Sequence, residues 1–363
     1  MKEEQFLILG LMSGTSLDGL DIVLCEFELL NKQWSYKVKK ALTQPFQCEL
    51  KEKLASAMEM SAFELACLDV ELGKFMAHAI NSFLENEVDE PMLIASHGHT
   101  IFHRPELGFS TQIGNGAVIA ALTKLPVICD FRSVDVALGG QGAPLVPIGD
   151  ELLFSKYGAC LNLGGFSNIS YQEGGVRKAF DILPCNIPLN LLAQKIGFDY
   201  DNDGKMAEKG EKDEILFQKL NQLEFYQQGN VVKSLGREWF DRHFLPILEN
   251  SSIRVVDKLR TVTEHIVYQI TETLNRVQAE TVLVTGGGAF NKFLIELLRE
   301  KNPQKEIILP DNETINFKES IVFAFLGLLR WRNEINSLKS VTGSAMDNCG
   351  GAIYSPCYKN NIF

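Results

Sequence analysis

The chain has 363 residues, with 35 lysines and arginines against 46 aspartates and glutamates, so its formal charge is −11. This acidic balance argues against a nucleic-acid binder that depends on electrostatics and against attraction to anionic membranes. The 12 prolines and 29 glycines are dispersed, which excludes a disordered or collagen-like chain, and the length predicts two domains.

Two further features indicate the compartment. No apolar run reaches the length of roughly 20 residues that a membrane span needs, and the acidic start at residues 1–5 is unlike the basic start of a signal peptide. The eight cysteines form no C-x-x-C pair, and several lie within apolar runs. We therefore expect a cytoplasmic protein with buried free thiols rather than a disulfide framework.

In chain order, apolar runs and helical spacing alternate. Short apolar runs predict strands at 6–11, 20–29, 92–95, 127–129, 159–163, 169–171 and 281–284. Apolar residues at helical spacing predict helices at 117–122, 253–277, 290–301 and 320–331. Strands that alternate with helices predict an α/β architecture, and the strand–turn–strand units at 6–29 and 159–171 suggest two related halves.

Three turns rich in small residues, at 13–19, 164–168 and 285–289, each follow a predicted strand. Backbone N–H groups of such turns can converge on a phosphate, and glycine permits the close approach. A tight hairpin is the simpler explanation for any single turn, but three favour a nucleotide site. Neither the P-loop motif nor the dinucleotide fingerprint is present.

Acidic side chains lie in and beside the first turn. Asp18 and Asp21 would repel bound phosphates unless Mg²⁺ mediates, which makes Asp18 a candidate magnesium ligand through water. The alternative is that these carboxylates cap their own turn. The residue pattern leaves both interpretations open.

Three polar segments supply candidate catalytic and binding residues. His97 and His99 follow a predicted strand, and we favour a polar substrate loop there over a metal site. Arg132 at another strand end is either an anion clamp or half of a structural pair with an aspartate. Asp181 ends an apolar run before a predicted helix, so it is either a residue like an N-cap or a catalytic base.

Together these motifs resemble the anhydro-N-acetylmuramic acid kinase family from about residue 10 to residue 351. The segments that carry the resemblance are 10–21, 96–100, 112–114, 130–132, 139–145, 162–168, 233–238, 286–291 and 341–343.

The resemblance implies two α/β domains of the actin-like, ribonuclease H-like class, each with a mixed five-stranded sheet, around a central ATP cleft. The implied boundaries are an N-terminal lobe at 1–131 with 345–363 packed on it, and a C-terminal lobe at 132–344. The implied nucleotide-binding positions are Gly14, Thr15, Ser16, Leu17, Asp18, Gly19, Leu20, Asp21, Gly164, Gly165, Asn168, Gly286, Gly287, Gly288 and Asn291.

The resemblance also implies a reaction. With ATP and Mg²⁺, the family phosphorylates the 6-oxygen of 1,6-anhydro-N-acetylmuramic acid while water opens the anhydro bridge, a step in peptidoglycan recycling. Asp181 matches the catalytic aspartate, and His97, Arg132 and Glu319 match positions expected to contact the sugar or to support the site. No nucleic-acid or membrane partner is implied, and relatives suggest a homodimer.

The chain departs from the family pattern after the catalytic aspartate. The family usually has D-T-G-P-G-N, whereas this chain has Asp181, Ile182, Leu183, Pro184, Cys185 and Asn186. Near residue 233, Val231 and Val232 replace a proline pair and Leu235 replaces a threonine. These changes keep two alternatives open, which are a kinase of another sugar and a catalytically impaired nucleotide-binding regulator.

Overall fold

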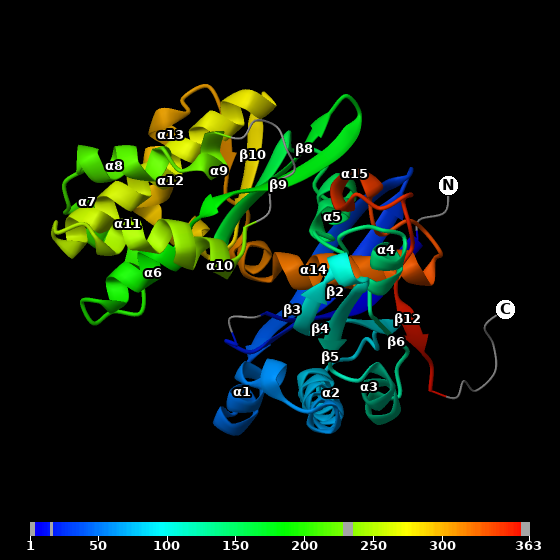
Figure 1. Ribbon diagram of the computed structural model, residues 1–363. Helices are drawn as coiled ribbons and strands as arrows, with labels where there is room; N and C mark the ends of the chain where they lie inside the picture. Colours follow the sequence, from blue (N-terminus) through cyan, green and yellow to red (C-terminus); the bar gives the residue numbers. More distant parts are fainter. Residues whose placement is uncertain (1–3, 15–16, 228–234, 357–363) are drawn as a thin grey trace. The chain divides into compact units, whose positions relative to one another are not determined.

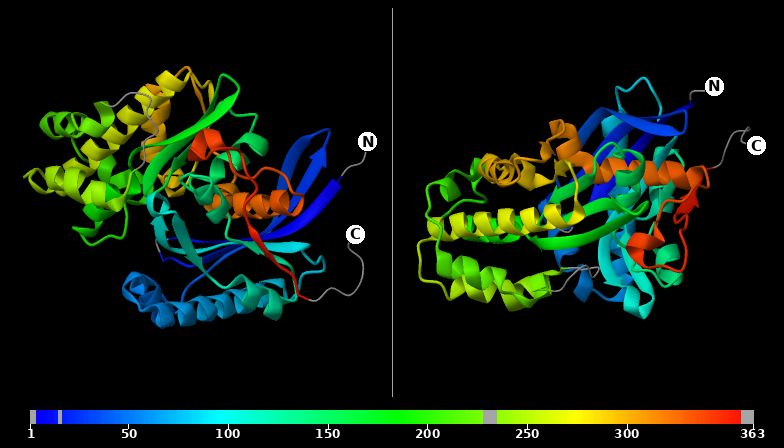
Figure 2. Two further views of the ribbon diagram at one scale, coloured as in Figure 1. Left: turned by 45° about the vertical axis from the view of Figure 1, so that its right-hand side comes forward. Right: turned by 90° about the horizontal axis from the view of Figure 1, so that it is seen from above.

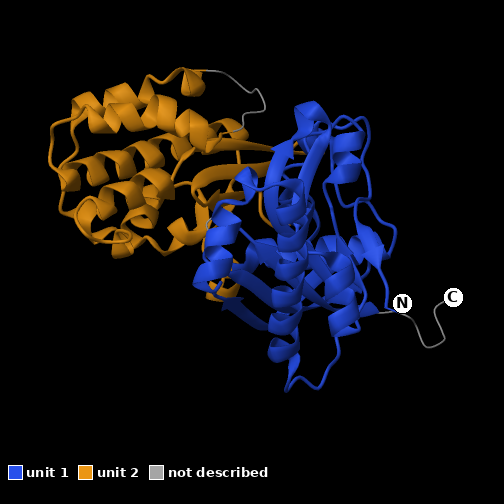
Figure 3. Cartoon of the chain, turned by 60° about the horizontal axis from the view of Figure 1, so that its bottom comes forward, with its two compact units in different colours: residues 1–154, 317–363 blue, residues 155–316 orange. Residues whose placement is uncertain are grey.

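The structure is a computed structural model that describes residues 4–14, 17–227 and 235–356. The chain forms two compact units (Figure 3). Unit 1 comprises Met1–Phe154 and Phe317–Phe363, and unit 2 comprises Ser155–Asn316. This division differs from the expected lobes, because residues 132–154 and 317–344 belong to unit 1.

Unit 1 contains a mixed sheet with helices on both faces (Figure 1). Its strands are β1 Glu4–Ser13, β2 Leu20–Leu30, β3 Gln33–Gln44, β4 Leu93–Arg104, β5 Phe109–Ile113, β6 Val127–Cys129 and β12 Ala352–Tyr354. Its helices are α1 Cys48–Ala55, α2 Ala62–Leu84, α3 Gly116–Thr123, α4 Ser133–Ala137, α5 Val146–Leu152, α14 Asn312–Trp331 from residue 317 onward, and α15 Lys339–Thr342.

Unit 2 is built in the same way, with most of its helices between its third and fourth strands. Its strands are β7 Ala159–Leu163, β8 Phe166–Glu173, β9 Val176–Pro184, β10 Thr281–Thr285 and β11 Glu306–Ile308. Its helices are α6 Asn186–Gln194, α7 Lys205–Glu208, α8 Glu214–Asn221, α9 Glu224–Gln227, α10 Arg237–Trp239, the π-helix η4 Phe240–Phe244, α11 Leu245–Glu249, α12 Val255–Val277 and α13 Lys292–Lys301.

The two sheets share one strand order. In unit 2 the order is β11-β10-β7-β8-β9, and in unit 1 the corresponding order is β6-β4-β1-β2-β3. In each sheet the first three strands in sequence are joined in antiparallel pairs. Two further strands, β4 and β6 in unit 1 and β10 and β11 in unit 2, then extend the sheet in parallel from the first strand. This repeated order confirms the α/β fold class of two ribonuclease H-like halves. Unit 1 extends the expected five strands with β12 and β5, which pair with β6 and β4.

Alternation along β1 explains how helices cover both faces of the unit 1 sheet. Leu9 and Leu11 join the core cluster that α2 completes, whereas Gly10 faces α14. A Cβ at Gly10 would lie 2.2 Å from the Ser320 oxygen, and one at Gly327 would lie 2.4 Å from the Ala95 Cβ. Glycine at both positions therefore lets α14 lie close against the sheet, on the side opposite α2 (Figure 2).

Asp135 explains why residues beyond 131 belong to unit 1. Its buried carboxylate accepts hydrogen bonds from the side chains of Ser337, Thr342 and Asn348 and from the backbone N–H of Gly142. Burial alone would raise the pKa of Asp135, but these bonds outweigh it and lower the pKa. One buried carboxylate thus joins α4 to the C-terminal segment of the same unit.

The structure confirms each predicted strand and helix. It adds elements that the apolar patterns did not reveal, chiefly β3, β5, β9 and the long α2. Within the described residues, no helix is long and apolar enough to cross a membrane.

Replacement of Asp135 by alanine tests this junction. Asp135→Ala removes the acceptor shared by four buried donors and leaves Ser337 Oγ and the Gly142 N–H unpaired, so the free energy of unfolding should fall by about 3 kcal/mol. The exposed Asp347, which accepts one bond from the Lys339 N–H, is the control, and Asp347→Ala should cost about 1 kcal/mol or less. Urea unfolding measures both variants, and equal losses would contradict the role of Asp135.

Candidate functional site

The first glycine turn joins β1 to β2 in unit 1. Leu17 has a left-handed backbone with φ 59°, and its N–H donates to the Gly14 oxygen at 3.2 Å. Thr15 and Ser16, both predicted to bind nucleotide, lie outside the described residues. A Cβ at Gly19 would lie 2.6 Å from the Gln44 oxygen, so glycine is needed where the turn meets the end of β3.

The two acidic residues of this turn have different surroundings. Asp18 is exposed, whereas Asp21 has entered β2 and accepts a hydrogen bond from Thr43 Oγ1 at 2.6 Å. Burial raises the pKa of Asp21, the Thr43 bond opposes that rise, and the nearby charge of Asp18 adds to it. The exposed Asp18 remains the candidate ligand for a hydrated cation, while Asp21 is engaged within the sheet.

His97 and Arg132 form the centre of the candidate sugar site. Arg132 Nη2 lies 2.8 Å from His97 Nε2, and His97 Nδ1 lies 3.0 Å from the Gly98 oxygen. Because the carbonyl can only accept, Nδ1 carries the proton and Nε2 accepts from the arginine. Burial and the charge of Arg132 hold the pKa of His97 well below its usual range, so this imidazole is neutral.

Local structure at the end of β6 sets the position of Arg132. Asp130 takes a left-handed backbone with φ 57°, and its carboxylate accepts from the Ser133 hydroxyl at 2.6 Å, which starts α4. Arg132 Nη1 donates to the Gly142 oxygen at 2.6 Å. Burial lowers the pKa of Arg132 to about 10, so it remains a cation, and its buried Nε has no partner among the described residues.

Glu319 on α14 completes this group. Its side chain retains contact with solvent, yet the surrounding protein desolvates the carboxyl and raises its pKa. Attraction to Arg132 opposes that rise, and repulsion from Asp21 adds to it. These interactions bring the predicted residues Glu319, Arg132 and His97 together in unit 1, within electrostatic range of the first glycine turn.

The histidine segment is not a loop, contrary to our expectation. It lies within β4, where Gly98 has φ +74° and a Cβ there would lie 2.6 Å from the Ile113 oxygen of β5. His99 is buried and its Nδ1 lies 2.9 Å from Ser13 Oγ. Pairing with β1 and β5 continues the strand past the polar residues, so His97 and His99 take separate partners.

The second and third glycine turns meet at the end of β7 in unit 2. The Gly164 and Gly165 carbonyls accept from the N–H groups of Asn186 and Cys185, at 3.1 and 2.8 Å. Asn186 Nδ2 in turn donates to the Leu163 oxygen at 2.9 Å. The Asn186 side chain therefore connects the second turn to the segment that follows the candidate catalytic aspartate.

The third turn packs on the same strand end. Gly286 has φ +81°, and a Cβ there would lie 2.4 Å from Asn162 Oδ1; one at Gly288 would lie 2.7 Å from the Leu163 Cβ. Gly287 is more open, with only Asn186 Nδ2 at 3.6 Å. Asn291 caps α13, because its Oδ1 accepts from the Leu294 N–H at 3.0 Å, so this carbonyl is already engaged.

Asp181 lies within β9 and does not cap a helix. Asn168 of β8 pairs with Asp181, whereas Ser167 pairs with Leu183, so Ile182 is an extra residue that forms a β-bulge. Asp181 Oδ2 accepts one bond from the Leu235 N–H at 2.8 Å. Burial raises the pKa of Asp181 to about 6, and the Leu235 bond opposes that rise. A half-buried carboxyl with this pKa is suited to general-base chemistry.

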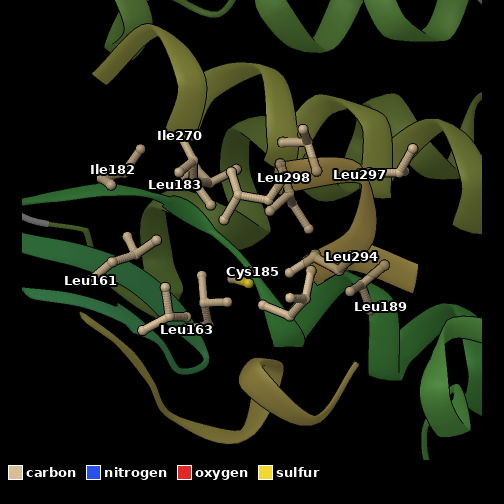
Figure 4. Packing of buried hydrophobic residues seen from close by; sticks show 14 of the residues in the cluster. Leu161, Leu163, Ile182, Leu183, Cys185, Leu189, Ile270, Leu294, Leu297 and Leu298 are labelled. Atoms are coloured by element: carbon tan, nitrogen blue, oxygen red, sulfur yellow. The ribbon is translucent and has the colours of Figure 1, made fainter. Parts of the chain in front are cut away.

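The residues that depart from the family pattern lie in the core. Ile182, Leu183 and Cys185 are buried in the main cluster of unit 2, among side chains of β7, α6, α12 and α13 (Figure 4). Cys185 has φ −110°, a value open to any residue, so its backbone does not require glycine. These side chains therefore fill the interior of unit 2.

Comparison with known proteins identifies the family. The sequence model of the anhydro-N-acetylmuramic acid kinase family matches residues 6–356. The chain belongs to this family. An anhydro-N-acetylmuramic acid kinase of Sulfurovum sp. (strain NBC37-1) is 34% identical over 371 residues, which cover 98% of this chain and 100% of the relative. A kinase of the same name from Pseudomonas savastanoi pv. phaseolicola is 36% identical, with 96% and 99% covered.

Among solved structures, a ROK family glucokinase from Streptomyces griseus in complex with glucose and AMPPNP covers 88% of this chain and 98% of its own. Its identity is 9% and its TM-score 0.41, a likeness too weak to support a conclusion.

In this member of the anhydro-N-acetylmuramic acid kinase family, the sequence does not predict two hydrogen-bonding groups at the site. They are the Leu235 N–H on Asp181 and the Gly142 carbonyl on Arg132. Both are backbone atoms, so residue type does not reveal them. The replacements at Val231 and Val232 lie outside the described residues.

The Cys185 thiol provides a test of the core assignment. The thiol is fully buried, and burial raises its pKa to about 12. Cys185→Ala should lower the free energy of unfolding by about 1 kcal/mol. It should change kcat by less than about twofold, because the thiol does not act on substrate. The exposed Cys67 serves as control, since Cys67→Ala should change neither quantity. A large loss of kcat with unchanged stability would place Cys185 at the site instead.

Proposed function

We propose that the protein is an ATP-dependent anhydro-N-acetylmuramic acid kinase that opens the 1,6-anhydro ring as it phosphorylates the sugar. The product would be N-acetylmuramic acid 6-phosphate, which places the reaction in the recycling of cell-wall fragments. The observation that carries this proposal is Asp181 on its bulged strand, half-buried and with a pKa raised to about 6. That environment gives one carboxylate the basicity needed to activate water near neutral pH.

Asp181 would take a proton from the attacking water. The water oxygen forms a bond to the anomeric carbon, and the bond between that carbon and the 6-oxygen breaks. The released 6-oxygen attacks the γ-phosphorus, and the bond to the β-phosphate oxygen breaks to release ADP. One water enters, its hydroxyl remains on the anomeric carbon, and the proton leaves through Asp181.

The unit 1 residues would bind the sugar. Arg132 remains a cation, which suits a negatively charged or carbonyl oxygen of the substrate. His97 is neutral and its Nε2 is occupied by Arg132, so it orients the guanidinium rather than transferring protons. The Glu319 side chain keeps contact with solvent and would accept hydrogen bonds from sugar hydroxyls.

The glycine turns would hold ATP. A Cβ at Gly287 would meet Asn186 Nδ2 at an ordinary contact distance of 3.6 Å, whereas Gly286 and Gly288 hold the backbone tightly on β7, which leaves a rigid surface for a nucleotide. We assign Mg²⁺ to the exposed Asp18 through water, since Mg²⁺ bound to phosphates keeps most of its waters. The ion would neutralise phosphate charge. Among the described residues, no cluster of three His, Cys, Asp or Glu side chains could hold a metal by itself.

The alternative of an impaired regulator loses its main support. That alternative depended on the bulkier residues after Asp181. Their side chains fill the core, and Asp181 lies directly before the bulge residue Ile182. The site geometry therefore favours a catalyst.

A product assay tests the proposed reaction. With ATP, Mg²⁺ and 1,6-anhydro-N-acetylmuramic acid, the protein should release ADP and generate one reducing sugar end per ADP, because ring opening frees the anomeric carbon. N-acetylglucosamine, which has no anhydro bridge, is the control and should release none. ADP release without a reducing end, or release only with the control sugar, would contradict the proposal.

The pH dependence tests Asp181 as the base. The base must be ionised, and its ionised fraction falls as the pH drops through the pKa of about 6. We therefore expect kcat/KM to fall below pH 6, about tenfold per unit, where an ordinary aspartate would remain ionised. Asp181→Asn should lower kcat by about 10²–10⁴ while calorimetry shows unchanged ATP binding. A pH profile flat down to pH 4.5, or near-normal turnover by the variant, would exclude this role.

A further inference from the structure

A hydrogen-bonded network of buried and half-buried polar side chains lies in unit 2, outside the residues assigned to substrate. Gln269 Nε2 donates to Asn221 Oδ1 at 2.8 Å, and His265 Nδ1 lies 2.9 Å from the same oxygen. Since an amide oxygen only accepts, Nδ1 carries the proton and Nε2 is the acceptor for the Tyr226 hydroxyl at 3.2 Å. Every donor direction in this network is thus determined, and it ends at Tyr226 of α9.

This hydrogen-bonded network keeps the same protonation states over the working pH range. His265 is fully buried on α12, and burial lowers its pKa to about 3, so it stays neutral across the working pH range. The hydroxyl of Tyr226 has its pKa raised by burial. Neither group titrates near neutral pH, so the network holds one hydrogen-bond pattern.

Aromatic contacts join this network to the far side of the segment 228–234. Tyr226 and Phe225 come just before that segment, and Trp239 follows it. The Trp239 ring lies 5.3 Å from Phe225 and 6.5 Å from Tyr226, measured between centroids. The residues on the two sides of the segment therefore pack against one another, and His265 supports the Tyr226 ring from α12 at 5.2 Å.

Trp239 is also linked through Gly236 to Leu235, whose N–H contacts the candidate base. The N–H groups of Trp239 and Phe240 donate to the Gly236 oxygen at 3.1 and 3.2 Å, which fixes the start of α10. Leu235 immediately precedes that glycine, and its N–H donates to Asp181. The π-helix η4 begins directly after Trp239, an irregularity often found where a helix serves a functional site.

We propose that His265, Tyr226 and Trp239 are positioning residues for the candidate base, because they hold the Leu235 N–H against the Asp181 carboxylate. We call these three residues the clasp. The inference rests on the proposed role of Asp181 and adds the residues that hold in place the N–H group opposing the effect of burial on its pKa.

Among the influences on the pKa of Asp181, the Leu235 N–H is the one that opposes burial. Asn168 lies opposite on β8, the Leu235 N–H contacts Oδ2, and no charged side chain among the described residues shifts this carboxyl. Burial favours the neutral acid, and the N–H favours the ionised base. A loosened clasp weakens the second influence alone, so the pKa of Asp181 should rise and less base should be present at neutral pH.

Tyr226→Phe tests the clasp, since it removes one hydroxyl and keeps the ring. The exposed Tyr268 on the same helix as His265 provides the matched control, Tyr268→Phe. Carbon-13 NMR of aspartate-labelled protein would titrate the Asp181 carboxyl, with Asp181→Asn assigning its signal. We expect Tyr226→Phe to raise the pKa of Asp181 by about half a unit to one unit and to move the acid limb of kcat/KM equally. Tyr268→Phe should leave both unchanged.

A purely structural role predicts a different result. If Tyr226→Phe lowers the unfolding temperature but leaves the titration of Asp181 unchanged, the proposal is overturned. If that variant does not fold, Trp239→Phe decides, because Trp239 lies outside the hydrogen-bonded network and should give the same upward shift. The NMR titration reads the carboxyl whether or not the protein turns over the sugar, so failure of the clasp and failure of the proposed function are distinguishable.

Discussion

The extra residue in β9 is the constraint on which unit 2 depends. Strand alternation places Phe180 toward the core and Asp181 away from it, and the bulge at Ile182 lets both Ile182 and Leu183 enter the core. Without the bulge, a buried Leu183 would demand the opposite orientation of Asp181. The hydrophobic effect thus fixes the direction of the one carboxyl on which the proposed chemistry rests.

Unit 1 depends on a different interaction, in which hydrogen bonds stabilise a buried charged group. Asp135 holds four donors in the interior, one of which is the N–H of Gly142. The carbonyl of Gly142 in turn fixes Arg132. Burial and the charge of Arg132 keep His97 neutral, and that charge also acts on Glu319. Asp135 thus supports the candidate sugar-binding residues through Gly142, although it is not itself at a candidate substrate-binding position. Loss of Asp135 would affect both fold and site.

The sequence predicts secondary structure well where the buried positions follow the period of a strand or a helix. Apolar spacing predicts β1, β2, β4, β6, β7, β8 and β10 and the helices α3, α12, α13 and α14, and the motif resemblance makes Asp181, His97, Arg132 and Glu319 candidate site residues. Exposed or mixed strands such as β3 were missed, because half-exposed positions dilute the apolar pattern. The histidine segment was misplaced in a loop, because cross-strand pairing rather than local polarity extends β4.

By itself, the sequence determined the family, the α/β class and the residue types at the site, because these depend on local patterns and on motifs in a fixed order. Only the tertiary structure decided which way the side chains after Asp181 point, what sets the pKa of that carboxyl, and where the chain divides into units. Each of these depends on contacts between residues far apart in the chain: Leu235 on Asp181, Asn348 on Asp135, and the core of unit 2 around Cys185. Spacing along the chain carries no record of such contacts, since they arise from burial and hydrogen bonding in the folded state.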